Sequence, residues 1–98
     1  MVQIRLFGYP RAFEWDLDKA DSNLQKHGIG FEDAVRVFDG PTADSLTLRR
    51  GELRAMAVGR LEGIEVTVVY VVRGSTFRII LARRARKDER RAYREIYS

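Results

Sequence analysis

The sequence predicts an α+β domain in which two short helices precede an antiparallel sheet of about four strands, and a further helix follows the sheet. Two observations lead to this fold class. Apolar residues recur at helical spacing as far as residue 38, and from Thr42 onward they alternate as in strands, with many β-branched residues. The length of 98 residues fits one compact domain, 1–98, with a modest core.

The opening segment is difficult to assign. Residues 2–7 have the composition of a short strand, but Gly8 and Pro10 interrupt it. We therefore expect residues 1–12 to be an N-terminal arm or an extra edge strand, followed by a brief extended piece at residues 13–15.

The first helix is expected at residues 17–27. Asp16 offers a side-chain cap for its first turn, and Gly28 suits the left-handed conformation that ends a helix. The expected buried stripe is Leu17, Ala20 and Leu24, with Asn23 and His27 beside it.

A second, shorter helix is expected at residues 31–38. Its apolar residues would share one face, and the sequence Asp39-Gly40-Pro41 would end it. The residues of that face are Phe31, Ala34, Val35 and Phe38.

The strands are predicted at residues 43–48, 53–60, 64–73 and 76–83. The dipeptides between them are short enough for successive hairpins: Arg50-Gly51, Glu62-Gly63 and Gly74-Ser75. The third strand is the most apolar, so we expect it at the centre of an antiparallel meander.

The last helix is expected at residues 86–97, and it belongs to a strongly basic tail. Asp88 and Glu89 fall in its first turn, and its buried stripe would be Ala92, Tyr93 and Ile96. Residues 78–98 carry seven arginines and one lysine against three acids, which gives a net charge of +5, whereas the whole chain is +4. The basicity is therefore local, and it favours a polyanionic partner.

Composition excludes several classes of chemistry. The chain has no cysteine and one histidine, so thiolate chemistry and the usual zinc sites are excluded, and we expect no metal and no cofactor. It contains no P-loop, no dinucleotide fingerprint and no nucleophile elbow. No signal peptide and no run of roughly 20 apolar residues is present, so we expect the protein in the cytoplasm.

The chemistry left to arginine is the stabilisation of charge on a phosphate. Cleavage of RNA by its own 2′-hydroxyl needs such cations, together with a base and an acid. In a regular last strand, alternation places Arg83 on the face of Phe77 and places Arg78 on the other face. The two could share a site only if a twist or bulge lay between them. On the second strand Arg54, Met56, Val58 and Arg60 share a face.

Each of these residues also has an ordinary structural interpretation. Arg83 or Arg84 alone is commonly a solvated strand end or half of an ion pair, and the helix arginines commonly form a solvated face. His27 and Tyr93 fit packed positions on their helices, and Lys26 fits a solvated helix end.

Two segments together resemble the BrnT family of toxins, from type II toxin-antitoxin systems. The first reads FEWDLDKADSNLQKHGIGFEDAVRVF, and the second, after an apolar strand ending in Tyr70, reads RIILARRARKDERRAY. The resemblance extends over residues 13–93. It implies a RelE-like fold, a metal-independent endoribonuclease that slows growth, and a BrnA-type antitoxin. The antitoxin's ribbon-helix-helix part would bind the DNA of its own operon. The chain has Leu81 where the family commonly has serine.

By motif match, the resemblance implies seven functional residues: Lys26, His27, Arg54, Arg78, Arg83, Glu89 and Tyr93. In this interpretation Arg83 holds the scissile phosphate with Arg54 and Arg78 nearby. The acid and base would come from His27, Lys26, Glu89 or Tyr93. Further contacts to RNA are expected from Arg60, Arg84, Arg86 and Lys87.

Two alternatives remain open. The chain could be a non-catalytic nucleic-acid-binding module whose basic tail grips phosphates, in which case affinity would fall steeply with salt and RNA would stay intact. It could also be an interaction protein whose basic surface meets an acidic antitoxin segment.

Overall fold

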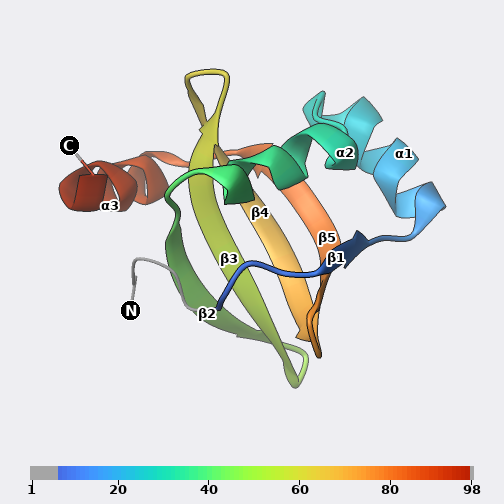
Figure 1. Ribbon diagram of the computed structural model, residues 1–98. Coiled ribbons are helices and arrows are strands. Elements are labelled where there is room, and N and C mark those ends of the chain that lie inside the picture. Colours follow the sequence, from blue (N-terminus) through green and yellow to red (C-terminus); the bar gives the residue numbers. More distant parts are fainter. Residues whose placement is uncertain (1–6, 98) are drawn as a thin grey trace.

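The computed structural model describes residues 7–97 and has the predicted α+β architecture (Figure 1). The elements in chain order are β1 (Ala12–Glu14), α1 (Leu17–His27), α2 (Phe31–Ala34), the 3₁₀ helix η1 (Val35–Asp39), β2 (Ala43–Arg49), β3 (Glu52–Leu61), β4 (Ile64–Arg73), β5 (Thr76–Arg84) and α3 (Lys87–Tyr97). The strand predicted within residues 2–7 lies outside the described residues, apart from Phe7.

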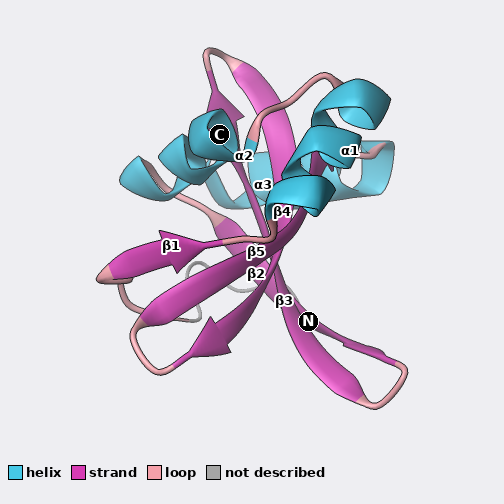
Figure 2. Cartoon of the chain, turned by 90° about the vertical axis from the view of Figure 1, so that its right-hand side faces the viewer, coloured by secondary structure: helices cyan, strands magenta, loops and turns pink. Residues whose placement is uncertain are grey.

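One twisted sheet carries all five strands in the order β1-β5-β4-β3-β2 (Figure 2). Strands β2 to β5 form the predicted antiparallel meander, and β4 is the central strand of the sheet, as expected. The predicted number of strands and the purely antiparallel pairing were wrong. The short piece around Phe13 is strand β1, which pairs in parallel with the outer edge of β5, so the sheet is mixed.

The hairpin turns lie at the predicted dipeptides. Arg50 and Gly51 have φ of 51° and 78°, and Glu62 and Gly63 have φ of 52° and 83°. Two central residues with positive φ are characteristic of type I′ turns, whose twist matches that of the strands they join. These turns fix the register of β2, β3 and β4, and therefore which side chains share a face of the sheet.

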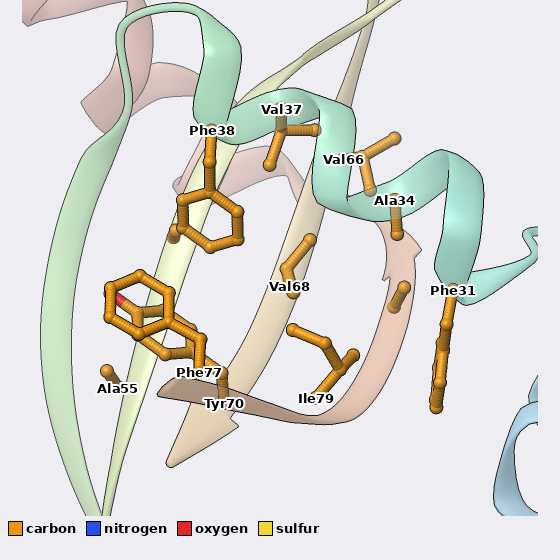
Figure 3. Close-up of a cluster of buried hydrophobic side chains, with 12 residues drawn as sticks. Phe31, Ala34, Val37, Phe38, Ala55, Val66, Val68, Tyr70, Phe77 and Ile79 are labelled. Atoms are coloured by element: carbon orange, nitrogen blue, oxygen red, sulfur yellow. The ribbon is translucent and has the colours of Figure 1, made fainter. Parts of the chain in front are cut away.

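One face of the sheet, which we call the core face, is covered by α2 and η1 (Figure 3). Phe38 of η1 packs edge-on against Tyr70 and Phe77, with ring centroids 5.2 and 5.3 Å apart. Gly59 of β3 lets η1 approach closely, since a Cβ atom there would lie 2.9 Å from Cβ of Val37. The main core of the protein therefore lies between η1, α2 and this face.

The second predicted helix is not continuous. It makes one α-helical turn and then tightens into η1. The buried residues Phe31, Ala34 and Val37 recur every three positions, which is the period of a 3₁₀ helix, and Val35 is only partly buried. Tighter winding thus buries Val37 together with Phe38 against the sheet.

Helix α1 has the expected caps but not the expected buried stripe. The Asp16 carboxylate accepts a bond from the Lys19 amide at 3.0 Å, and Gly28 has φ of 72°. Leu17 and Leu24, however, are 76% and 50% exposed. The helix lies beside the edge of β5 rather than across a face (Figure 1), so a narrower strip of it is buried.

Helix α3 covers one end of the sheet's other face. Tyr93 and Ala85 form a second apolar cluster with Ala43 and Val58, and the partly buried Ile96 and Tyr97 pack against it. The rest of that face is not covered by a helix in the described part of the chain (Figure 1).

Candidate active site

A β-bulge in β5 brings the predicted arginines to the same face. Val71 of β4 pairs with Arg78, and Thr67 pairs with Arg83. Val71 and Thr67 are four residues apart on a regular strand, so their partners point to the same side. The register shifts between Val69 and Tyr70, which leaves Ile80 as an extra residue in β5. The prediction that Arg78 and Arg83 lie on opposite faces was wrong because alternation alone cannot reveal a bulge.

We call this side of the sheet the arginine face. It also carries Arg54 and Met56 of β3, in agreement with the predicted alternation. Cross-strand pairing arranges its side chains in rows. One row runs through Val58, Thr67 and Arg83 and lies next to α3, and the next row runs through Met56, Val69 and Leu81.

The second of these rows forms the floor of a hollow of about 530 Å³, which we call the arginine hollow. Its lining residues are Thr47, Arg49, Arg50, Arg54, Met56, Val69, Ile80, Leu81, Arg83 and Arg86. Half of these are arginines and none is acidic. The hollow therefore combines an apolar floor with a strongly positive rim.

Arg83 and Glu89 form a two-pronged ion pair at the edge of this hollow. Nη1 and Nη2 of Arg83 lie 2.7 and 2.8 Å from the two carboxylate oxygens. The carboxylate also accepts bonds from the Thr67 hydroxyl and the Arg86 amide, at 2.9 and 2.8 Å. The last bond is the reciprocal half of a capping box at the start of α3. Glu89 thus ties β4, β5 and α3 together and fixes the orientation of the Arg83 guanidinium.

These contacts set the ionisation of Glu89. Burial by itself would raise its pKa, but the bonds from Arg83, the Arg86 amide and Thr67 outweigh burial and lower the pKa from 4.5 to about 2. The same pairing raises the pKa of Arg83. A carboxylate with such a low pKa is a poor proton acceptor at neutral pH, which favours the other candidates for acid and base.

Two further predicted arginines are paired more loosely. Nε of Arg54 lies 2.8 Å from a carboxylate oxygen of Glu52, and Nη1 of Arg78 lies 3.8 Å from Glu14. Arg54 lines the arginine hollow, whereas Arg78 lies on the same face but outside the lining. The structure therefore brings Arg54 and Arg83 to one hollow, with Arg78 beyond it.

Lys26 and His27 lie in a smaller hollow on the other side of the bulge. This second hollow, of about 190 Å³, shares Ile80 and Leu81 with the arginine hollow. Asn23, one turn before these two residues, accepts a bond from the Ala82 amide and donates to its carbonyl, at 3.1 and 2.9 Å. Asn23 thus anchors α1 so that Lys26 and His27 border the residues that separate the two hollows.

The other predicted residues lie elsewhere, except Arg86, which lines the arginine hollow. Tyr93 is 2% exposed and lies on the buried side of α3, with the Arg60 guanidinium carbon 5.5 Å from its ring centre. Arg84 borders a separate hollow near Glu65, and Lys87 lies on the exposed surface of α3. These positions surround α3 rather than the arginine hollow.

Sequence reasoning missed several residues of the site. The predicted strand stops at residue 48, so Arg49 has no predicted role, and Arg50 is predicted only as a turn residue, yet both line the arginine hollow. Thr47 lies directly opposite Arg54 on the arginine face. The local signal for these residues was the short β2–β3 turn, because a two-residue turn sets the last residues of β2 opposite the first residues of β3.

The arrangement suits the binding of a phosphodiester by guanidinium groups. His27 and Lys26 line the second hollow, which shares Ile80 and Leu81 with the arginine hollow. Among residues 7–97, no three histidine or carboxylate side chains gather where they could hold a metal ion. The helices of this same region include none that is long and apolar enough to cross a membrane.

Comparison with known proteins gives a family match. No curated protein matches the chain. A family model described as "Ribonuclease toxin, BrnT, of type II toxin-antitoxin system" matches residues 15–89, a segment that includes both hollows and the Arg83–Glu89 pair. The chain therefore belongs to the BrnT family of ribonuclease toxins.

Proposed function

We propose that this chain, as a single domain, is a metal-independent endoribonuclease that acts in the cytoplasm, arrests growth and is neutralised by a BrnA-type antitoxin. The observation that carries the proposal is the gathering of Arg54, Arg83 and Arg86 around one open hollow on the sheet. Family membership supports the reaction class and the existence of an antitoxin.

In the proposed reaction, the RNA 2′-oxygen attacks the neighbouring phosphorus and a base takes the 2′-hydroxyl proton. The bond from phosphorus to the 5′-oxygen breaks, and an acid protonates that oxygen. The products carry a 2′,3′-cyclic phosphate and a 5′-hydroxyl. Arg83, held in place by Glu89, and Arg54 stabilise the charge that builds on the phosphate.

We assign the proton transfers to His27 and Lys26. Both border the second hollow, which shares Ile80 and Leu81 with the arginine hollow. Glu89 is paired with Arg83, and Tyr93 is buried between α3 and the sheet. We therefore propose that Glu89 orients Arg83 and that Tyr93 supports α3.

The test is cleavage of RNA by the purified chain in the presence of a chelator, with the product ends mapped. The double variant R54A/R86A should slow cleavage by at least about a hundredfold, because it removes Arg54, one of the two cations assigned to the transition state, and a second positive charge from the same rim. The matched control R36A/R91A removes equal charge from η1 and from the exposed side of α3, and it should stay within about twofold. Cleavage that needs a divalent ion, or equal losses in both variants, would contradict the proposal.

The same preparation distinguishes the non-catalytic alternative. A binding module would retain RNA with an affinity that falls steeply with salt, and the RNA would be recovered intact. Expression of the chain with and without a neighbouring ribbon-helix-helix gene tests the antitoxin and the arrest of growth.

A further inference from the structure

The floor of the arginine hollow is an apolar strip in a positively charged setting. Met56, Val69 and Leu81 are level with one another on three adjacent strands, and all three are half-buried. Helix α3 covers the preceding row, where Val58 packs under Tyr93. Counted from α3, the row of Met56, Val69 and Leu81 is thus the first row of the arginine face that is open to a ligand.

The rim supplies charge that is not already neutralised. Arg54 and Arg83 are paired with Glu52 and Glu89. In contrast, Arg49, Arg50 and Arg86 form no side-chain ion pair or hydrogen bond with any other residue in the range 7–97. Arg49 and Arg50 lie at the β2–β3 turn, and Arg86 lies after β5, so these charges stand on two sides of the floor.

A floor of three apolar side chains in one row, between two groups of cations, suits a ligand with a planar apolar body and an anionic group on either side. A nucleotide within a strand has this form, because its base has two flat faces and a phosphate precedes and follows it. An acidic peptide would satisfy the rim but would offer no flat surface to the floor.

We propose that one nucleobase of the substrate lies flat on Met56, Val69 and Leu81, with its flanking phosphates on the Arg49–Arg50 side and the Arg86 side. In a duplex the faces of each base are covered by stacked neighbours, so this subsite accepts only an unpaired, unstacked base. The inference rests on the proposed function and specifies its substrate as single-stranded RNA with one base displaced at the site.

The first test uses 2′-O-methyl RNA, which lacks the attacking hydroxyl and so reports binding alone. The variant L81S should weaken binding of a single strand about fivefold, at the low end of the range for loss of base stacking. The matched control L48S alters a leucine that is 71% exposed on the core face of the sheet, and its affinity should stay within about twofold. Binding of a duplex of the same sequence should be equally weak for both variants and the unaltered chain.

The second test begins with the unaltered chain, so its first readout does not depend on whether L81S folds. A series of strands, each with a single abasic position, should contain one strand that binds about fivefold more weakly than its neighbours. With that strand the effect of L81S should disappear, because the base that rests on Leu81 is already missing. The salt dependence of binding should be unchanged in L81S and reduced in R49A/R50A.

Equal losses for L81S and L48S, or the absence of a sensitive abasic position, would overturn this subsite. If RNA is still cleaved in that case, the proposed function stands without it. If the chain neither binds nor cleaves RNA, the proposed function itself fails. Displacement of bound RNA by an acidic peptide, with a loss of peptide affinity in L81S, would assign the floor to a protein partner and would also overturn the inference.

Discussion

Arg83 and Glu89 face each other across the junction of β5 and α3, and both side chains are largely buried, with 13% and 14% of their surface exposed. The guanidinium that is the leading candidate to hold phosphate is therefore already paired with a carboxylate. Loss of activity in an Arg83 variant has two possible causes, loss of the cation and loss of the junction.

A pair of variants separates these causes. R83A leaves the Glu89 carboxylate without its cation and should lower the free energy of unfolding by about 2 kcal/mol, below the range for fully buried pairs. R83A/E89Q should recover most of that stability, because the uncompensated charge is gone. Cleavage should remain low in both variants. Urea unfolding and RNA cleavage measured on the same samples provide the check, and recovery of both stability and cleavage would refute a direct role for Arg83.

Stability should fall in acid partly through Glu89. Its folded pKa of about 2 lies below the ordinary value of 4.5, so the unfolded chain takes up its proton first as the pH drops. The contribution is complete above pH 4.5 and is lost as the pH falls towards 2. Arg94 likewise lowers the pKa of Glu65, which adds a second contribution of the same sign.

E89Q should therefore narrow the difference in unfolding free energy between neutral pH and about pH 3. The control E95Q changes a carboxylate on the exposed side of the same helix and should leave that difference as it is in the unaltered chain. An E89Q difference as large as that of the unaltered chain would show that the Glu89 contacts do not set the acid response.

Asn23 should be difficult to replace. The variant N23L fills a similar volume but leaves the Ala82 amide and carbonyl without partners, and it should cost about 1–3 kcal/mol. Q25L on the exposed side of α1 should change stability by no more than about 0.5 kcal/mol. Thermal or urea unfolding measures both, and equal costs would mean that the Asn23 bonds contribute little.

Gly59 should be equally sensitive for a steric reason. In G59A the new methyl group would lie 2.9 Å from Val37 Cβ and 3.2 Å from Thr42 Cγ2, so η1 must move away from the sheet. We expect a loss of about 1–3 kcal/mol, as for other overpacked cores. Gly40 has open space around it, and G40A is the matched control. A stable G59A would indicate that η1 shifts at little cost.

Local signals in the sequence predicted the parts of the fold that depend on them. Turn dipeptides and alternation located the meander, and Asp16 and Gly28 located the ends of α1. The exposure of Leu17 and Leu24 could not be predicted, because it depends on α1 lying along the edge of β5. The parallel pairing of β1 is likewise a long-range contact with no local signature.

In the candidate site, too, features with a local sequence pattern were predictable and features that depend on long-range contacts were not. The alternation of β3 correctly placed Arg54 and Met56 on one face. The position of Arg78 relative to Arg83 depended on the single extra residue Ile80, whose bulge has no distinctive composition. The partner of Arg83 was uncertain for another reason, since a basic tail with three acids allows many ion pairs, and only the fold selects Glu89.

The outer edge of β5 is covered near both of its ends, by two different means. Strand β1 covers its beginning, and the Asn23 side chain takes up the backbone groups of Ala82 near its end. An exposed strand edge is a common starting point for aggregation and domain swapping. This side of the sheet should therefore resist edge-to-edge association when the chain is concentrated, even though β4 is rich in valine and β5 contains two isoleucines.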